Sequence, residues 1–249
     1  MVFARDRELP KTVQMQTDER PLRELALFAG AGGGLLASKL LQWKTVAAVE
    51  RDEHCLACLE QRQREGALDD FPIYRDVCEF DGAPWRNRVD VVSGGFPCQP
   101  FSSAARGRNV ARDLWPHMLR IIIQAGPLWV FAENVQLSPL HRASNDLSAL
   151  GYRSAVVRLG AADLGLPHRR NRFWLAAYSN GNGQPVGAEH EKMAVVCDFA
   201  KAHSQRFSLR GVRGADGLAR RLGRLRAAGN GQVPRVAVAA WDLLSQTLK

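Results

Sequence analysis

One cysteine of this sequence stands in a setting suited to covalent chemistry. Cys98 lies within the sequence GGFPCQP, directly after the apolar stretch Val89–Val92, which predicts a strand. Prolines on both sides stiffen the loop, and the polar Gln99 argues against a core position. Open α/β sheets bind ligands at the carboxyl ends of their strands, so a cysteine held there is placed as a nucleophile. The alternative is a small buried hydrophobe, which is the usual fate of a free cysteine.

A carboxylate and two arginines stand at the ends of later apolar stretches. Glu133 follows Leu128–Ala132, and Arg170 and Arg172 stand where the stretch Arg172–Ala177 begins. If strand order is kept, Glu133 lies beside the strand that leads to Cys98, where a raised pKa would let it act as an acid. The alternating arginines point to the same side and are suited to an anion or a base. The alternative for Glu133 is a surface ion pair, and the alternative for the two arginines is a basic sheet edge that prevents aggregation.

A glycine-rich turn near the start predicts a nucleoside site. The sequence AGAGGG at 29–34 follows an apolar run and precedes a helical pattern. Glycines let the backbone approach a ligand, and a helix N-terminus offers free N–H groups. Glu50 ends the next strand, 18 residues past Gly32, where an acidic residue binds ribose hydroxyls. Asp76 follows a third short strand and is suited to an adenine amino group, so we expect a nucleoside cofactor.

Alternating strands and helices must position these side chains. The expected strands are 24–28, Thr45–Val49, Val89–Val92, Leu128–Ala132, Tyr152–Leu159 and Arg172–Ala177. The expected helices are Leu35–Leu41, Asp52–Arg64, Leu114–Ala125, Ser138–Leu150 and Ala237–Leu248. This alternation indicates βαβ units and hence an α/β fold with a Rossmann-like, doubly wound, mostly parallel sheet.

The composition is that of a globular protein, and the charge indicates an anionic partner. Apolar residues make up 46% and charged residues 24%, which excludes a disordered, collagen-like or coiled-coil chain. The absence of a long apolar run and of a signal-like N-terminus leads us to expect a cytoplasmic protein with no membrane partner. The net charge rises from −3 in residues 1–100 to +4 in 101–200 and +8 in 201–249. Such asymmetry favours nucleic acid first and a membrane surface second.

The cysteines indicate neither disulfides nor a metal site. Their number, five, is odd, and a cytoplasmic chain keeps its thiols reduced. Cys55 and Cys58 have the spacing of half a zinc site, but no second pair follows. Together with Leu59 they fall on one face of a helix, which predicts a buried apolar position, so we expect no metal.

Five segments, taken in order, resemble the motifs of the DNA (cytosine-5)-methyltransferases, which use S-adenosylmethionine. They are LFAGAGG at 27–33, PCQ at 97–99, ENV at 133–135, RNR at 170–172 and GNGQVP at 229–234. Ala26, His168 and Gln232 stand where the family usually has Asp, Gln and Val. The match runs from about Leu25 to Leu244, and the combination of PCQ, ENV and the final GN is highly specific.

The resemblance implies a covalent mechanism. The Cys98 thiolate would add to carbon 6 of cytosine and make carbon 5 nucleophilic enough to accept the methyl group, which leaves S-adenosylhomocysteine as the product. Glu133 would hold or protonate ring nitrogen 3, Arg172 would donate to the carbonyl at carbon 2, and Arg170 would brace the site or Glu133. These atoms are out of reach in a stacked duplex, so the target base must be flipped out.

The resemblance also implies two binding surfaces. The cofactor would contact Phe28, Gly30, Gly32, Glu50, Asp76, Pro97, Leu114 and Asn230. The DNA backbone would contact Arg106, Arg108, Arg112, Arg210, Arg213, Arg221 and Arg224. Phosphate contacts of this kind position a protein on the duplex without reading its sequence.

We expect three parts along the chain. A polar leader covers 1–22, a catalytic domain covers 23–178 and 229–249, and a target-recognition region covers 179–228. This recognition region is short for the family. It would read a short site, rely on the second subunit of a homodimer, or be a remnant. A cognate restriction endonuclease is a further expected partner, within a restriction–modification system.

Two other functions compete with DNA methylation. The first is RNA cytosine-5 methylation, because a tRNA-methylating branch of the family shares PCQ and ENV. The second is a catalytically silent nucleic-acid-binding relative, which the departures at Ala26, His168 and Gln232 support. Competition between duplex DNA and tRNA separates the two enzymes, and a labelled-methyl assay separates both from the silent protein.

Overall fold

The computed structural model describes residues 20–97, 113–179, 194–196 and 231–248. The strands are β1 (Arg23–Leu27), β2 (Lys44–Val49), β3 (Ile73–Tyr74), β4 (Val91–Gly94), β5 (Trp129–Asn134), β6 (Arg153–Gly160), β7 (Asn171–Tyr178) and β8 (Ala194–Val196). The helices are α1 (Gly33–Leu40), α2 (Glu53–Arg64), α3 (Trp115–Ala125), α4 (Leu137–Ala149) and α7 (Pro234–Leu248). Two short 3₁₀ helices are η1 (Ala83–Trp85) and η2 (Ala162–Leu164).

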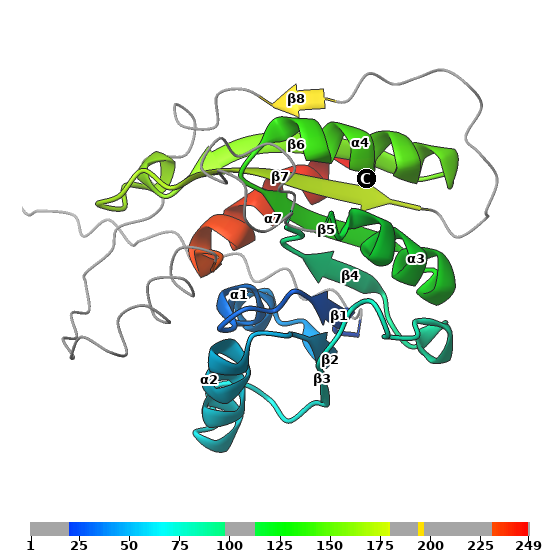
Figure 1. The fold of residues 1–249 in the computed structure, drawn as a ribbon. Helices are drawn as coiled ribbons and strands as arrows, with labels where there is room; N and C mark the ends of the chain where they lie inside the picture. Colours follow the sequence, from blue (N-terminus) through cyan, green and yellow to red (C-terminus); the bar gives the residue numbers. More distant parts are fainter. Residues whose placement is uncertain (1–19, 98–112, 180–193, 197–230, 249) are drawn as a thin grey trace, which may run out of the picture.

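All the described strands form one sheet in the order β3-β2-β1-β4-β5-β7-β6-β8 (Figure 1). Strands β1 to β5 pair in parallel, and β8 pairs in parallel with β6. Strand β7 is antiparallel to both of its neighbours, β5 and β6. The predicted α/β fold with a doubly wound, mostly parallel sheet is therefore confirmed, and β4 and β5 are neighbours as expected.

Helices cover both faces of the sheet. Helices α3 and α4 pack on one face, where Met118 and Leu140 join a core with Leu25 and Val92. Helices α1 and α7 pack against each other on the opposite face. Strands of a parallel sheet that is covered on both faces are apolar along most of their length. This is why the later parts of β1 and β2 and the first parts of β4 and β5 are apolar in the sequence.

An aromatic cluster fixes α7 to the sheet. The Trp241 ring centroid lies 4.6 Å from that of Trp43, 4.8 Å from that of Trp129 and 5.5 Å from that of Phe131. Edge-to-face contacts of this kind stabilise a pair by about 1 kcal/mol beyond the burial of area. The cluster holds the middle of α7 against the sheet. Just before α7, Gln232 lies against Gly33 and Gly34 of the first turn, about 200 residues away in the sequence.

An ion cluster around the buried Asp90 closes the edge of the sheet at which β1 and β4 begin. Both carboxylate oxygens of Asp90 accept hydrogen bonds from the guanidinium groups of Arg20 and Arg23, at 2.6–3.1 Å. Burial by itself would raise the pKa of Asp90, but the hydrogen bonds from Arg20 and Arg23 outweigh it and hold the pKa well below its usual range. The start of β1 is therefore fixed to the start of β4.

The predicted elements agree with the structure to within a few residues, with one informative shift. The strand expected at Val89–Val92 is β4, Val91–Gly94, because Gly94 still pairs with Leu27 and Ala132. A Cβ at Gly94 would lie 2.6 Å from the Leu27 carbonyl oxygen, so this glycine permits close strand packing as well as the turn.

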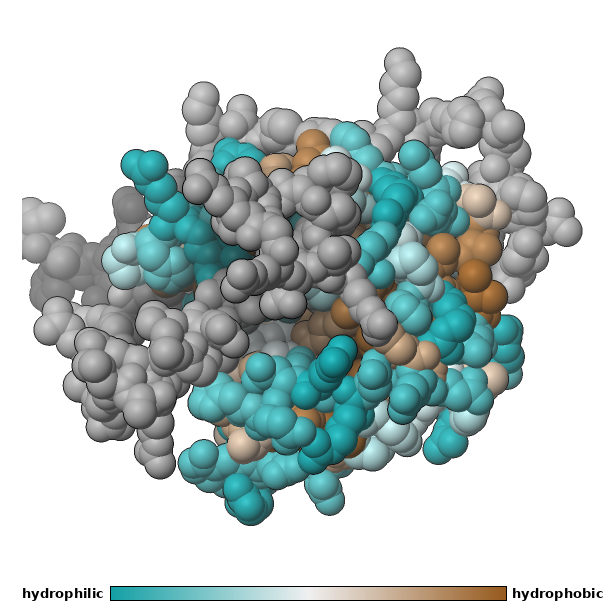
Figure 2. Space-filling view, in the orientation of Figure 1, coloured by the Kyte–Doolittle hydropathy of each residue, from teal (hydrophilic) through white to brown (hydrophobic). Residues whose placement is uncertain are grey.

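The surface fits a chain whose apolar residues are mostly internal. Hydrophilic residues dominate the described part of the face in Figure 2, and apolar ones show in a central band and at one edge. Within the described ranges, no helix combines the length and apolar character needed to span a bilayer.

Candidate active site

Three neighbouring strands end at the same edge of the sheet. Leu27 of β1, Gly94 of β4 and Ala132 of β5 lie side by side in the parallel register. The turn after β1, the segment after β4 and Glu133 of β5 therefore meet at the carboxyl edge. This is where open α/β sheets bind their ligands.

The glycine turn after β1 has a backbone that few residue types adopt. Phe28, Gly30 and Gly32 have φ angles of 54°, 55° and 87°. A Cβ at Gly32 would also lie 2.9 Å from the Leu59 side chain, so glycine is required there for both reasons. Helix α1 then begins with no side-chain hydrogen bond at its N-cap. Its N-terminal N–H groups suit an anionic group of a ligand.

Glu50 holds this turn through its carboxylate. Oε2 accepts a hydrogen bond from Gly30 N at 2.6 Å, and Oε1 accepts from Arg51 N at 2.8 Å and Asp52 N at 2.7 Å. A carboxylate has about four lone-pair positions, so acceptor capacity remains for a ligand hydroxyl. The structure thus gives Glu50 a role in shaping the turn, while its contact with ribose stays a prediction.

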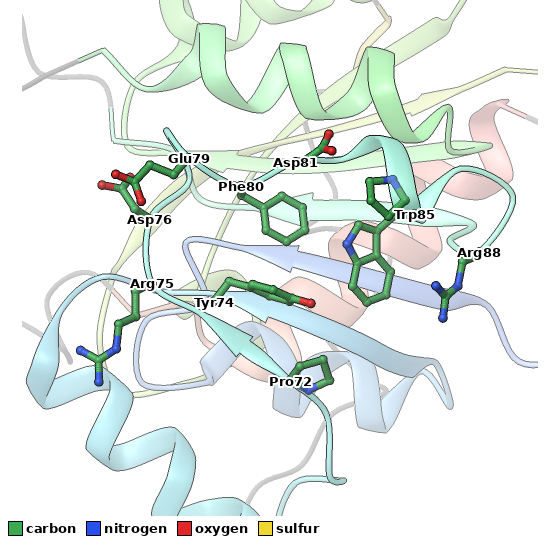
Figure 3. A pocket seen from close by; sticks show the side chains of 10 residues that line it. Pro72, Tyr74, Arg75, Asp76, Glu79, Phe80, Asp81, Trp85 and Arg88 are labelled. Atoms are coloured by element: carbon green, nitrogen blue, oxygen red, sulfur yellow. The ribbon is translucent and has the colours of Figure 1, made fainter.

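Asp76 lies at one end of a cavity of about 600 Å³ beside β3 (Figure 3). Its Oδ1 accepts a hydrogen bond from Cys78 N at 2.8 Å. The rings of Tyr74, Phe80 and Trp85 line the same cavity. Between β3 and β4 the chain forms the short η1 and loops in place of a longer helix. This larger cavity does not include Glu133, so it is not the place where the predicted catalytic residues meet.

A narrower cleft, with about 40 Å³ of open room, lies at the carboxyl edge itself. It is lined by Ala26, Leu27, Phe28, Ala29, Gly30, Gly34, Leu35, Ser93, Gly94, Gly95, Glu133, Gly231 and Gln232. The predicted site residues Phe28, Gly30 and Glu133 therefore come together here. Pro97 is exposed just beyond the cleft, and Leu114 packs against the core at the start of α3, so neither lines it.

Glu133 is the most perturbed acid at this edge. Its side chain is 8% exposed, and burial raises its pKa to about 7, although the positive charges of Arg172 and Arg170 oppose the rise. Arg172 Nε lies 2.8 Å from Oε1 in an ion pair. This pairing lowers the pKa of Glu133, but by less than burial raises it. At neutral pH this group can therefore carry a proton or release one.

The antiparallel register explains how Arg172 reaches Glu133. Glu133 stands opposite Trp174 across β5 and β7, and Arg172 lies two residues from Trp174 on the same face of the sheet. The register therefore brings a buried acid and an arginine together at this edge, although the expected neighbour of Glu133 was Arg170. Arg170 donates instead to the carbonyl oxygen of Gly231, which links β7 to the segment before α7.

Two further residues belong to the site, although the sequence analysis gave neither a role there. Asn134 Nδ2 donates to Phe96 O at 3.0 Å, two residues before Cys98, and its Oδ1 accepts from Gln136 N. Gln232 packs its backbone against Gly33 and its side chain against Gly34, so that a Cβ at either glycine would overlap it. The sequence could have indicated a role for Asn134, because this residue follows Glu133 on the strand next to β4.

Several predicted residues lie outside the described residues. They are Cys98, Arg106, Arg108, Arg112, Arg210, Arg213, Arg221, Arg224 and Asn230. Their roles stay predictions. The structure describes the segment that leaves β4 toward Cys98. Asn134 holds Phe96 of this segment through a hydrogen bond.

Residues 22–208 match the family model of the C-5 cytosine-specific DNA methylases. The chain belongs to this family. Among curated members, the type II methyltransferase M.Eco47II of Escherichia coli is 33% identical over 167 residues, which cover 63% of this chain and 39% of that protein. M.HhaI of Haemophilus parahaemolyticus is 28% identical over 169 residues, covering 64% and 50%. The chain spans between about two fifths and a half of the length of these curated type II methyltransferases.

Solved structures agree with the observed fold. The Dnmt2 methyltransferase of S. pombe superposes with a TM-score of 0.52 at 19% identity, covering 66% of this chain and 52% of that one. A putative DNA modification methyltransferase encoded within an E. coli prophage gives a TM-score of 0.50 at 25% identity, covering 64% and 47%. The C-5 methylase assignment and the α/β fold are therefore consistent with each other.

Proposed function

We propose that this protein transfers a methyl group from S-adenosylmethionine to carbon 5 of cytosine in double-stranded DNA. The observation that carries the proposal is Glu133, a buried acid paired with Arg172 next to the strand that leads to Cys98. Membership of the C-5 cytosine-specific DNA methylases supports the same chemistry.

In the proposed reaction Cys98 is the nucleophile. Its thiolate forms a bond to carbon 6 of the cytosine ring, and the ring electrons move to carbon 5. Carbon 5 then takes up the methyl group, its proton leaves to a base, and the bond from Cys98 to carbon 6 breaks to restore the ring. Asn134 supports this role, because it fixes Phe96 two residues before the cysteine.

Glu133 offsets the charge that builds on the ring. A carboxyl group whose pKa is about 7 donates a proton or a hydrogen bond to ring nitrogen 3 at neutral pH. Arg172 donates to the carbonyl oxygen at carbon 2, and Arg170 holds the segment at Gly231 that closes the cleft. The base must leave the stack to reach these groups, at a cost of a few kcal/mol.

The residues at the carboxyl edge fit the cofactor. S-adenosylmethionine, when bound, supplies the methyl group on a sulfonium that leaves as a neutral thioether. The glycine turn with its positive φ angles gives room for close approach, and the N-terminus of α1 suits the carboxylate. Glu50 and Asp76 are assigned to the ribose and the adenine, with Pro97, Leu114 and Asn230 as further contacts.

The partners follow from the proposed substrate. Duplex DNA is bound through the arginines of 102–113 and of the basic segment after residue 200. Curated relatives such as M.Eco47II and M.NgoMIV are named type II methyltransferases, which supports a place in a restriction–modification system with a cognate endonuclease. We propose a cytoplasmic protein, with a homodimer as the arrangement that would complete the short recognition region.

Covalent trapping tests the proposed function. The protein is incubated with S-adenosylmethionine and a duplex that carries 5-fluorocytosine at varied sites. Because fluorine cannot leave as a proton, the reaction stops at the Cys98 adduct. We expect a DNA–protein band that resists denaturation, and sequencing of the trapped DNA gives the site.

Two cysteine variants serve as matched controls for the trap. Cys98→Ser should form no adduct and should keep less than roughly 0.1% of the methyl transfer rate, as nucleophile variants do. Cys58→Ser, on helix α2, should form the adduct as the wild type does. Adduct formation by Cys98→Ser would remove this residue from the mechanism, and trapping on tRNA in place of DNA would identify an RNA methyltransferase.

A further inference from the structure

A glutamine beside Glu133 has no part in the mechanism above. Gln232, just before α7, lines the cleft together with Glu133 and Gly95. Its side-chain amide donates a hydrogen bond to the Glu133 carboxylate. A Cβ placed at Gly95 would lie 2.8 Å from Oε2 of Glu133 and 3.4 Å from Nε2 of Gln232, so Oε2 is the oxygen that faces the amide. The motif that this segment resembles usually has valine at position 232, and a valine side chain has no group to donate.

The two oxygens of Glu133 are held by different donors. The guanidinium group of Arg172 pairs with Oε1, at 2.8 Å from Nε, whereas the amide of Gln232 faces Oε2. The charged groups that act most strongly on Glu133 both belong to β7, namely Arg172 and Arg170. On the other side of Glu133, the chain that leaves β4 brings in Gly95, which carries no charge. Gln232 therefore adds a neutral donor to a carboxylate whose main charged neighbours are cations.

The segment around Gln232 is held in place by its neighbours. Its backbone carbonyl group packs against Gly33, and its Oε1 lies beside Gly34, where a Cβ would be only 2.6 Å away. Arg170 donates to the carbonyl oxygen of Gly231, the residue before it. A donor that is already held loses little conformational entropy when it forms its hydrogen bond. The amide is therefore suited to fix the orientation of the Glu133 carboxyl group.

Such a donor acts on the proton of Glu133 as well as on its position. A hydrogen bond from a neutral amide stabilises the charged carboxylate, so it opposes the rise in pKa that burial causes. A further positive charge would oppose this rise more strongly and keep the group ionised, and a valine would not oppose it at all. The amide has an intermediate effect, which suits a group that must release a proton and take it back.

We propose that Gln232 is a positioning residue for Glu133. Its amide fixes Oε2 and sets how readily the carboxyl group gives a proton to ring nitrogen 3 and regains it. The inference deepens the proposed function and rests on it for the role of Glu133 in methyl transfer. The contact itself is present without any ligand, so it can be tested before substrate is added.

Titration of Glu133 by ¹³C nuclear magnetic resonance tests this contact in the ligand-free protein. The carboxyl signal is identified by its loss in Glu133→Gln. Gln232→Met keeps nearly the same length but lacks the amide, so a hydrogen bond to a charged group is lost. We expect the pKa of Glu133 to rise by about one pH unit, a tenfold change in proton affinity. Gln232→Val should raise it by a similar amount and serves if the methionine variant fails to fold.

Gln61→Met is the matched control. Gln61 is exposed on α2, where its amide donates to Glu65, so the pKa of Glu133 should stay at the wild-type value. An unchanged pKa of Glu133 in a folded Gln232→Met or Gln232→Val variant overturns the proposal. An equal rise in Gln61→Met overturns it as well, because the effect would then not come from the contact.

The pH profile of single-turnover methyl transfer shows whether the reaction uses this contact. Because the protonated carboxyl group of Glu133 is the donor, the rate should fall as the pH rises through its pKa. In Gln232→Met this fall should move to higher pH by about one unit. A profile that does not move, although the pKa of Glu133 does, overturns the role of Gln232 in the reaction. A wild-type protein that methylates no cytosine, yet shows the expected titrations, overturns the proposed function and not the contact.

Discussion

At the scale of single residues, the surroundings decide what a carboxylate does. Asp90, held by two guanidinium groups, has its pKa lowered, whereas Glu133 has a pKa of about 7. Both side chains are buried, but the arginines near Glu133 lower its pKa by less than the loss of surrounding water raises it. The same residue class thus stays charged at one edge of the sheet and exchanges a proton at the other.

The raised pKa of Glu133 predicts a pH-dependent stability. A carboxyl group with a folded-state pKa above its unfolded value of about 4.3 contributes stability that is present below that value and lost as the pH rises through about 7. The free energy of unfolding should therefore fall by up to about 4 kcal/mol across this window. Urea denaturation at several pH values measures it.

Glu133→Gln should remove this part of the pH dependence, since the amide does not titrate. Glu60→Gln, an exposed change on α2, should leave the wild-type profile intact. A profile of Glu133→Gln that still falls as steeply as the wild type would show that another group titrates in its place. The pKa of Glu24 is also raised, so Glu24 adds a pH dependence of the same sign to both proteins. The contribution of Glu133 is therefore read from the difference between the two profiles.

At the scale of elements, the site is an assembly of strand ends and one helix start. β1, β4 and β5 supply its floor, and the first turn of α1 forms one wall. The segment before α7 closes this wall, because Gln232 lies against Gly33 and Gly34. The aromatic cluster around Trp241 holds α7, and so this segment, in place.

Gly33→Ala should disturb the site through this contact. Alanine normally stabilises a helix by about 1 kcal/mol relative to glycine, but here its Cβ overlaps the carbonyl group of Gln232. The backbone must shift, so we expect a loss of about 1–3 kcal/mol of stability and at least a tenfold weaker binding of S-adenosylhomocysteine. Thermal unfolding and calorimetry give the two values.

Gly66→Ala is the comparison for this prediction. Gly66 has a positive φ but open space around it, so alanine there should cost about 1–2 kcal/mol and leave ligand binding unchanged. Equal losses of ligand affinity in the two variants would mean that global stability, and not the contact with Gln232, controls the cleft.

At the scale of the whole molecule, charge is distributed unevenly along the chain. The last 49 residues carry +8 of the net +9, while the first hundred carry −3. In a protein that acts on DNA, such a segment supplies contacts to phosphates. Because forming these contacts releases counterions from the DNA, binding weakens as the salt concentration rises. The arginines concerned lie outside the described residues, so solution measurements must test them.

Reversing charge in the basic segment should weaken DNA binding at every sequence. We expect the double change Arg221→Glu and Arg224→Glu to lower the slope of log affinity against log salt by about 2, close to one for each lost phosphate contact. The double change Lys44→Glu and Arg64→Glu alters the net charge equally at exposed positions of β2 and α2. An equal loss of slope in both proteins would mean that net charge, and not a specific surface, binds the duplex.

The sequence by itself determined much of the fold and part of the site. Apolar runs alternating with amphipathic helices predict a parallel sheet, and the carboxyl ends of parallel strands meet at one edge. The glycine turn and Glu133 could therefore be placed near each other before any coordinates. These features depend on local patterns and on a rule that every open α/β sheet follows.

Tertiary structure alone decided the contacts between distant segments. Nothing local indicates that β7 inserts between β5 and β6, which brings Arg172 to Glu133. Likewise, Ser38, Thr45 and Ser93 meet on Glu24 across separations of 14 to 69 residues. A buried polar group selects its partners by distance and angle in the folded chain, and these quantities are set by the packing of whole elements.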